Sequence, residues 1–174
     1  MEIASIFEPV QEDLLKVEQG LKAITRADFP WIAEMLEYVL GDGGKRIRPA
    51  LTLLAGKLYN YDSKLLIPMA MAVELTHTAT LVHDDAIDRS PIRRGKATIN
   101  KLWGDTAAVL LGDYLFAASG YLMSTTENSR IVGIHAQTVE TISAGELKQA
   151  FNAYKLEQTR NEYFQRIGCK TASL

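Results

Sequence analysis

Residues 81–95 of this chain read Leu81-Val82-His83-Asp84-Asp85-Ala86-Ile87-Asp88-Arg89-Ser90-Pro91-Ile92-Arg93-Arg94-Gly95. A cluster of three aspartates is followed closely by paired arginines. On a helix, Asp84 and Asp88 are one turn apart and share a face, whereas Asp85 lies about 100° further round. Two carboxylates on one face can reach hard cations together, and they repel each other unless a cation lies between them. The stretch therefore predicts a magnesium site that binds diphosphate.

Apolar residues recur at helical spacing along nearly the whole chain, and no alternating strand pattern is present, so the sequence predicts an all-α fold. The helix that carries the aspartates is capped by Asp62 and Ser63, has Pro68 in its first turn and continues until Pro91. The other expected helices are residues 3–24; a helix capped by Asp28, with Pro30 in its first turn, that stops at Gly41-Asp42-Gly43-Gly44; a helix opened by Pro49; residues 106–124, capped by Asp105; residues 128–157; and a last helix that starts at the capping box Thr159-Arg160-Asn161-Glu162.

The chain has 174 residues, of which 47% are hydrophobic, and it shows no linker or repeat, so we expect residues 1–174 to belong to one domain. The long helices are apolar around much of their circumference, as in residues 69–75, and such helices need neighbours on several sides. About seven helices can form a closed bundle. Further helices or a partner chain are the other ways to cover these surfaces.

Composition excludes several classes of function. With 19 basic and 21 acidic residues, the chain lacks the basic field that nucleic-acid binding needs. The single cysteine, Cys169, cannot form an internal disulfide. Glu74, His77 and Asp113 interrupt the most apolar stretches, so we expect no membrane span, and the acidic N-terminus is unlike a signal peptide. We therefore expect a cytoplasmic protein.

Residues 43–49 read Gly43-Gly44-Lys45-Arg46-Ile47-Arg48-Pro49 and place two glycines and three cations between two expected helices. Backbone N–H groups and cations at such a place can hold a phosphate. The alternative is a glycine helix stop followed by a solvated basic turn.

His77 precedes Asp84 by two helical turns and lies on nearly the same face, so it can donate to a second phosphate. A lone histidine in a helix is more often hydrogen-bonded structure. His83 lies off this face, and we do not expect it to take part. The paired arginines, Arg93 and Arg94, can each bind diphosphate oxygens by forked hydrogen bonds, or form an exposed basic loop.

Three further pairs of residues keep two interpretations open. Lys170-Thr171 offers a cation and a hydroxyl to a phosphate, or forms a charged helix end. Gly112-Asp113 and Gly145-Glu146 interrupt apolar helices, and mark either close helix contacts or the wall of a polar cavity.

Six elements occur along the chain in a fixed order: Gly44-Lys45-Arg46-Ile47-Arg48-Pro49, His77, Asp84-Asp85-Ala86-Ile87-Asp88, Arg93-Arg94-Gly95, Gly112-Asp113-Tyr114-Leu115-Phe116 and Lys170-Thr171-Ala172. With these elements the chain resembles a trans-type polyprenyl diphosphate synthase. The resemblance implies an antiparallel helical bundle of the isoprenoid synthase type. It covers only the N-terminal half to two-thirds of what that family requires, because the second aspartate-rich motif is absent from this sequence.

The resemblance also implies roles for single residues. Isopentenyl diphosphate would bind to Lys45, Arg48, His77 and Arg94. The allylic diphosphate would bind to Arg93, Lys170 and Thr171. Magnesium would be coordinated by Asp84 and Asp88, with Asp85 as a further candidate, and the catalytic residues would be Asp84, Asp88 and Lys170.

In the family that the chain resembles, the allylic diphosphate departs, and the double bond of isopentenyl diphosphate attacks the resulting allylic carbocation. Cations stabilise the charge on the departing diphosphate, and an apolar cavity shelters the carbocation from water. Product length in this family depends on side chains below the aspartates. The positions four and five residues before Asp84 are Thr80 and Ala79, neither of which is an aromatic plug, so we expect a medium or long product.

Because the second aspartate cluster is missing, we expect this polypeptide alone to be inactive or nearly so, and we interpret it as a fragment of a longer enzyme. The alternative is a non-catalytic regulatory or binding subunit of a heteromeric synthase. A terpene cyclase needs no second diphosphate site, so Lys45, Arg48 and His77 argue against that class. The resemblance further implies a homodimer, with membrane contact that is at most peripheral.

Overall fold

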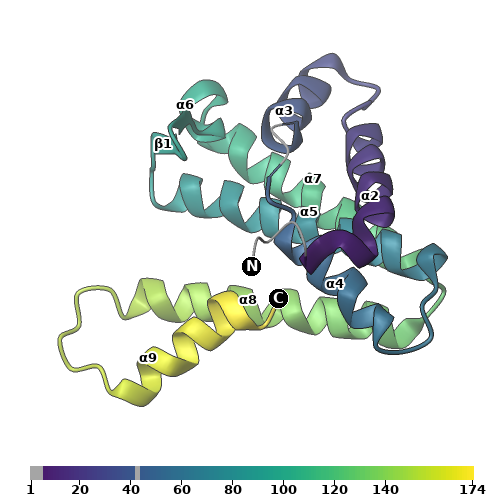
Figure 1. Ribbon diagram of the computed structural model, residues 1–174. Coiled ribbons are helices and arrows are strands. Elements are labelled where there is room, and N and C mark those ends of the chain that lie inside the picture. Colours follow the sequence, from purple (N-terminus) through teal and green to yellow (C-terminus); the bar gives the residue numbers. More distant parts are fainter. Residues whose placement is uncertain (1–5, 42–43) are drawn as a thin grey trace. The chain divides into compact units, whose positions relative to one another are not determined.

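The apolar helix expected to carry the aspartates is α5 (Ser63–Ile87), and Asp88 forms its C-terminal cap. The computed structural model describes residues 6–41 and 44–174, and most of this part is helical (Figure 1). The all-α prediction is therefore confirmed. The chain divides into two compact units, Met1–Glu127 and Asn128–Leu174. The expectation of one domain stays a prediction.

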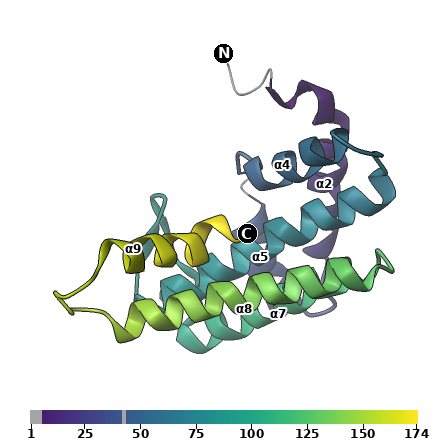
Figure 2. The same ribbon diagram turned by 90° about the horizontal axis from the view of Figure 1, so that it is seen from below.

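In the first unit, α5 packs against α7 (Asp105–Ser124) on one side, and against α2 (Gln11–Ile24) and α4 (Ile47–Lys57) on the other (Figure 2). The remaining helices of this unit are η1 (Glu8–Val10), α3 (Pro30–Leu40) and α6 (Ile99–Trp103). The side chains buried at the centre come from five helices: Leu21, Leu36, Leu53, Leu75 and Leu115. Each fully buried leucine contributes about 1.5–3 kcal/mol to stability.

The close packing of α5 on α7 depends on a glycine. A Cβ placed on Gly112 would overlap ring atoms of His83, whose Nε2 is 2.8 Å from the backbone oxygen of Val109. Of the two interpretations of Gly112-Asp113, the structure therefore favours a close helix contact at Gly112.

The predicted start of α5 is confirmed at its cap, because the Asp62 side chain accepts a hydrogen bond of 2.9 Å from the backbone N–H of Lys64. The prediction for Pro68 was wrong. Pro68 lies inside the helix, in the second turn, where the proline ring leaves the backbone oxygen one turn earlier without its N–H partner.

Two other predicted caps were wrong by one residue. The cap of α3 is Phe29 and not Asp28, because the residue before a proline is forced into an extended conformation, here φ −100° and ψ 119°. The cap of α7 is Gly104 and not Asp105, because the chain enters this helix with φ 90°, which glycine adopts freely. Asp105 is the first residue of the helix, where its charge still favours the helix dipole.

The other boundaries agree with the predictions to different degrees. α2 ends at Ile24 as expected, and α3 ends at Leu40 with Gly41 as its cap. Asp42 and Gly43 of the expected stop lie outside the described residues, as do the first residues of the expected helix 3–24. α4 begins at Ile47, so Pro49 lies in its first turn without opening it.

A β-hairpin between α5 and α6 was not predicted. β1 (Ile92–Arg93) pairs antiparallel with β2 (Lys96–Ala97), and Arg93 lies opposite Lys96. The turn consists of Arg94 and Gly95, which have φ values of 51° and 80°. Two consecutive positive φ angles are what a two-residue hairpin turn requires. The pair Arg94-Gly95 was therefore the available signal.

The second unit contains α8 (Ser129–Phe151), α9 (Arg160–Ile167) and the π-helical turn η2 (Gly168–Ala172). α8 ends six residues before the predicted Glu157, where the side chain of Gln158 donates to the backbone oxygen of Asn152. The predicted capping box is confirmed, since Thr159 and Glu162 exchange side-chain-to-backbone hydrogen bonds. A Cβ on Gly145 would lie 2.7 Å from the Cβ of Cys169, which indicates a close contact of α8 with η2.

Two helices, α5 and α7, are long and apolar enough to cross a membrane when judged by length and composition alone. Core helices meet the same criterion, and these two pack against each other. This observation therefore does not favour a membrane span.

Candidate functional site

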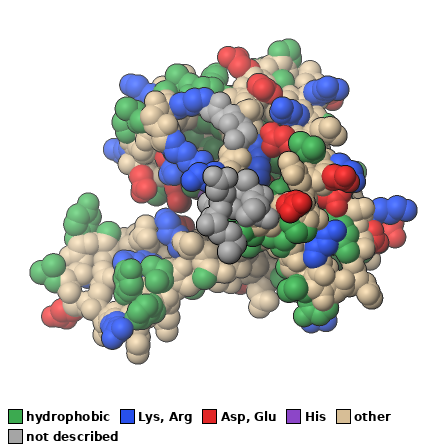
Figure 3. Space-filling view, in the orientation of Figure 1, with side chains coloured by type: hydrophobic (Ala, Val, Ile, Leu, Met, Phe, Trp, Pro, Cys, Tyr) green, Lys and Arg blue, Asp and Glu red, His purple; other side chains and the backbone are tan. Residues whose placement is uncertain are grey.

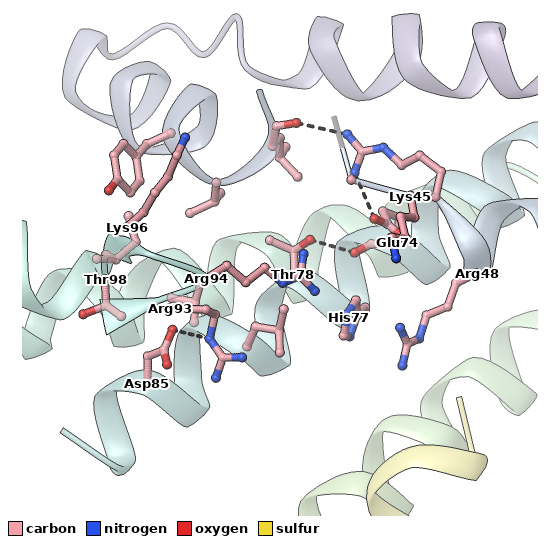
Figure 4. Close-up of a pocket in the computed structure, with 18 of the residues that line it drawn as sticks. Lys45, Arg48, Glu74, His77, Thr78, Asp85, Arg93, Arg94, Lys96 and Thr98 are labelled. Atoms are coloured by element: carbon pink, nitrogen blue, oxygen red, sulfur yellow. Dashed lines mark hydrogen bonds and ion pairs between the residues drawn. The ribbon is translucent and has the colours of Figure 1, made fainter. Parts of the chain in front are cut away.

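A cavity of about 590 Å³ in the first unit brings together residues that are far apart in the sequence. Lys45 and Arg48 come from the loop before α4 and its first turn, His77 comes from α5, and Arg94 comes from the turn of the hairpin (Figure 4). These are the four residues for which the resemblance implied isopentenyl diphosphate binding. Figure 3 shows Lys and Arg side chains gathered around a hollow on this face of the first unit.

The elements that carry these residues are held by hydrogen bonds within the first unit. The Tyr38 hydroxyl donates to the backbone oxygen of Ala97 at 2.8 Å, and so connects α3 to the hairpin. The Thr98 hydroxyl and the Asn100 side chain both donate to the backbone oxygen of Ser90. These contacts fix the base of the hairpin, and Arg94 extends from its turn toward His77 (Figure 4).

The electrostatics of the cavity keep His77 neutral. Burial lowers the pKa of this side chain to about 4, and the positive charges of nearby side chains act in the same direction; these are Arg48, Arg94 and Arg93. A neutral imidazole surrounded by guanidinium groups can donate one hydrogen bond to an anion. The arrangement therefore suits a ligand with several negative charges.

Asp85 and Arg93 form an ion pair at one end of the cavity. The Nε of Arg93 donates to Oδ2 of Asp85 at 2.7 Å. This bond, together with the charges of all three aspartates, raises the pKa of Arg93. The other oxygen of Asp85, Oδ1, is buried and has no hydrogen-bond partner within residues 6–41 and 44–174.

Asp84 lies in the last turn of α5, and Asp88 is the C-terminal cap of this helix. The backbone N–H of Asp88 donates to the oxygen of Asp84 at 2.8 Å, so the two residues are one helical turn apart, as expected. Neither residue is among those that line the cavity, whereas Asp85 is. In the described part of the chain, no group of three His, Cys, Asp or Glu side chains converges. Magnesium commonly binds through one or two carboxylates together with substrate phosphates, so this donor set fits it.

Lys170 and Thr171 belong to the second unit and lie in η2. The Nζ of Lys170 forms an ion pair of 2.6 Å with Oε1 of Glu146 in α8, and Thr171 is exposed. Single π-helical turns occur frequently at functional sites. The structure therefore places these two residues on an irregular turn, which the sequence did not indicate.

The two residues expected to control product length, Ala79 and Thr80, lie in α5 about one turn before Asp84. Ala79 is completely buried in the core, and the partly buried Thr80 donates its hydroxyl to the backbone oxygen of His77 at 2.7 Å. Neither of them lines the cavity described above.

Several lining residues were missed by sequence reasoning, namely Tyr38, Glu74, Thr78, Lys96 and Thr98. Glu74 had a detectable signal, because a carboxylate within an apolar helix requires a partner. Its partner is Arg46, at 2.9 Å from Glu74 Oε1 to Arg46 Nη1. The three cations of residues 43–49 therefore do not have equivalent surroundings.

Comparison with known proteins supports the resemblance. The model of the family described as Polyprenyl synthetase matches residues 29–174. Heptaprenyl diphosphate synthase component 2 of Geobacillus stearothermophilus is 37% identical over 174 residues, which is 100% of this chain and 54% of that protein. The crystal structure of a decaprenyl diphosphate synthase from Rhodobacter capsulatus has a TM-score of 0.93 and 38% identity, and the match covers 98% of this chain and 53% of that one.

A third similar protein is a polyprenyl synthase from Caulobacter crescentus CB15, whose crystal structure is a complex with calcium and isoprenyl diphosphate. Its TM-score is 0.93 at 33% identity, and the match covers 99% of this chain and 52% of that one. The chain spans about half the length of the curated relatives it matches. The helical fold of these structures confirms the expected isoprenoid synthase type. Because the family model matches most of the sequence, the chain belongs to the polyprenyl synthetase family.

Proposed function

We propose that the cavity of the first unit binds the diphosphate group of isopentenyl diphosphate. The observation that carries the proposal is the meeting of Lys45, Arg48, His77 and Arg94 in one cavity. Guanidinium groups bind phosphate oxygens in forked pairs, lysine supplies a point charge, and neutral His77 donates one hydrogen bond. The mixture suits a diphosphate with an apolar tail, because Leu81 and Ile99 also line the cavity.

The function proposed for the complete protein is a polyprenyl diphosphate synthase that joins isopentenyl diphosphate to an allylic diphosphate. The carbon–oxygen bond of the allylic substrate breaks, and its electron pair leaves with the diphosphate. The double bond of isopentenyl diphosphate then attacks the carbocation, and a proton is lost to form a trans double bond. The side chains proposed to stabilise the departing diphosphate are Arg93, Lys170 and Thr171.

Magnesium is the proposed cofactor, held by Asp84 and Asp88, with Asp85 directed to Arg93 instead. When bound, it supplies positive charge to the allylic diphosphate. The calcium and isoprenyl diphosphate in the Caulobacter crescentus structure support a site for a divalent cation beside a diphosphate.

The proposed product has a medium or long chain. The support is the modest size of Ala79 and Thr80 and the heptaprenyl and decaprenyl synthases among the similar proteins.

We also propose a cytoplasmic homodimer with at most peripheral membrane contact. Leu110, Tyr114 and Tyr121 are exposed on α7 at helical spacing, which supports association through this helix. Light scattering that gives only a monomer at micromolar concentration would count against a dimer.

A heteromeric assembly is the second candidate, favoured by the relative from Geobacillus stearothermophilus, which is named as a component of its synthase. In this case the chain would act as a regulatory or binding subunit. Adding the chain to a competent synthase separates the candidates, because a subunit changes the product distribution and an incomplete fragment does not.

The cavity is tested by isothermal titration calorimetry of the purified chain with isopentenyl diphosphate. Lys45→Gln, Arg48→Gln and Arg94→Gln should each weaken binding about tenfold to a hundredfold. Lys101→Gln is the matched control, since Lys101 is an exposed cation of α6 outside the cavity. Equal affinities for all four variants and the unaltered chain would contradict the proposal.

A second experiment tests our expectation that these 174 residues alone are inactive. It measures the incorporation of labelled isopentenyl diphosphate into lipid, together with the intact mass of the same sample.

A further inference from the structure

Arg46 lies between the two proposed diphosphate ligands of its segment, Lys45 and Arg48, yet its guanidinium group is already engaged by protein. Its Nε donates to Oε2 of Glu18 at 2.7 Å, and its Nη1 donates to Oε1 of Glu74 at 2.9 Å. Its Nη2 donates to Oε1 of Glu18 at 3.3 Å and to the backbone oxygen of Leu40 at 3.0 Å. Four of the five N–H groups of the side chain are therefore used.

The partners of Arg46 come from three different helices. Glu18 belongs to α2, Leu40 is the last residue of α3, and Glu74 belongs to α5. The side chains of Arg46 and Glu74 are only 13% and 11% exposed. A guanidinium group that binds three helices at once fixes the place where its own backbone can lie.

The backbone of Arg46 needs such support. It has φ 47° and ψ 36°, a left-handed conformation that a residue with a Cβ seldom adopts unless its surroundings hold it there. Arg46 is also the N-terminal cap of α4, and its backbone oxygen accepts the hydrogen bond of Ala50 that closes the first turn. The residue therefore sets both the turn of the chain and the start of the helix that carries Arg48.

The charge of Arg46 is balanced locally. Burial alone would lower its pKa, but the hydrogen bonds and charges of Glu18 and Glu74 outweigh burial and raise the pKa above its ordinary value. Two carboxylates face one guanidinium group, so this cluster offers no net positive charge to an anion. Lys45 and Arg48 also line the cavity, and neither has an ion pair with Glu18 or Glu74 among the described residues.

We propose that Arg46 is a positioning residue, whose ion pairs with Glu18 and Glu74 hold Lys45 and Arg48 at the diphosphate cavity. This inference rests on the proposed function of the cavity. The competing interpretation is that Arg46 is a third cationic ligand of the diphosphate.

The two interpretations predict opposite signs for the glutamate variants. If Arg46 acts through its charge on the ligand, Glu74→Gln and Glu18→Gln remove negative charge near the diphosphate and strengthen binding. If Arg46 is a positioning residue, loss of either glutamate loosens the segment and weakens binding, in the same direction as Arg46→Gln.

The experiment measures the affinity of the purified chain for isopentenyl diphosphate by isothermal titration calorimetry. We expect Arg46→Gln, Glu74→Gln and Glu18→Gln each to weaken binding about tenfold. The double variant Arg46→Gln with Glu74→Gln should bind about as weakly as the single variants, since both remove the same pair. Arg46→Lys keeps the charge but loses the fork, so it should restore binding only in part.

Two controls separate positioning from general loss of stability. Val17→Ala removes a completely buried side chain next to Glu18 and destabilises the same helix without touching the ion pairs, so its affinity should stay unchanged at a temperature where it is folded. Lys16→Gln removes an exposed charge of α2 and should also bind normally. If Arg46→Gln does not fold, the two glutamate variants still carry the test.

Hydrogen exchange of residues 44–52 in the unliganded chain provides a readout without ligand. Faster exchange in Arg46→Gln and Glu74→Gln, but not in Lys16→Gln, is expected. Tighter binding by the glutamate variants would overturn the positioning role and assign Arg46 to the ligand. Unchanged binding by Arg46→Gln would overturn it too. Absence of binding to the unaltered chain would instead refute the proposed function, and the positioning role with it.

Discussion

Arg93 donates a hydrogen bond of 2.7 Å from its Nε to Oδ2 of Asp85, and so connects the hairpin to the end of α5. The side chain of Asp85 is 9% exposed and that of Arg93 is 37% exposed. Adjacent aspartates of one motif therefore have different surroundings: Asp85 faces the hairpin, whereas Asp84 and Asp88 share the face proposed for magnesium. Asp85 therefore holds the Nε of Arg93, the residue that we propose as a ligand of the allylic diphosphate.

The first prediction concerns Asp85. Asp85→Asn should lower the free energy of unfolding by about 1.5–3 kcal/mol, because a hydrogen bond between charged groups is lost in a nearly buried place. Asp88→Asn, at the exposed end of α5, should change it by no more than about 0.5 kcal/mol. Urea unfolding of both variants makes the comparison. Equal effects would show that the Asp85–Arg93 pair does not stabilise the hairpin.

The second prediction concerns magnesium. With inorganic diphosphate as the probe, added Mg²⁺ should strengthen binding to the purified chain about tenfold, and a chelator should abolish that gain. Asp84→Asn and Asp88→Asn should each reduce the gain, while Asp85→Asn should retain it. Calorimetry with and without Mg²⁺ measures this difference. A gain that survives in both Asp84→Asn and Asp88→Asn would refute the assignment of these two carboxylates.

The third prediction is a dependence of stability on pH. The pKa of His77 is about 4 in the folded chain, below the ordinary histidine value of 6.5, so the unfolded chain binds more protons between these values. The contribution of His77 to stability is therefore complete above pH 6.5 and is lost as the pH falls toward 4. Between pH 7 and pH 5 the expected loss is at most about 2 kcal/mol, and solvent screening at this partly exposed side chain reduces it.

The measurement for His77 is urea unfolding at both pH values, with His77→Gln for comparison. The variant should lose less stability on acidification than the unaltered chain. It will keep some dependence on pH, because burial also lowers the pKa of His135. The same loss in variant and unaltered chain would show that His77 is not the group that titrates.

The fourth prediction compares two glycines of α7. Gly112→Ala should lower the free energy of unfolding by about 1–3 kcal/mol, because the new Cβ would meet the His83 ring, which is hydrogen-bonded to Val109. Gly120→Ala is the matched control. A Cβ there meets no atom of the described residues within 4 Å, so alanine should stabilise the helix by up to about 1 kcal/mol. Destabilisation by both substitutions to the same extent would contradict the close contact at Gly112.

Local features of the fold were predictable wherever they depend on neighbours within one helical turn. The cap at Asp62, the capping box of Thr159 and Glu162, and the one-turn spacing of Asp84 and Asp88 are such features. The wrong predictions for Asp28 and Asp105 are also local. Each failed because the neighbouring residue is the N-terminal cap. Phe29 is extended because it precedes a proline, and Gly104 has a positive φ that glycine adopts freely.

The candidate site was predictable as a set of residues but not as an arrangement. The sequence identified Lys45, Arg48, His77 and Arg94, and the structure brings them into one cavity. The sequence did not reveal that Arg46, in the same basic run, forms ion pairs with two glutamates from other helices. All three cations of the run are alike in local pattern, and only the position of α2 and α5 distinguishes them.

The sequence by itself determined the helical class, most helix positions, the family and the residue types of the site. These follow from apolar periodicity, capping groups and motif order, which are properties of neighbouring residues. Only the tertiary structure decided which ion pairs form, namely Asp85 with Arg93, and Arg46 with Glu18 and Glu74. It also decided that the His83 ring packs directly against Gly112. The physical reason is that helix packing brings together groups that are separated by many residues along the chain. It therefore determines which side chain forms an ion pair with a charged residue and which side chain packs against a glycine.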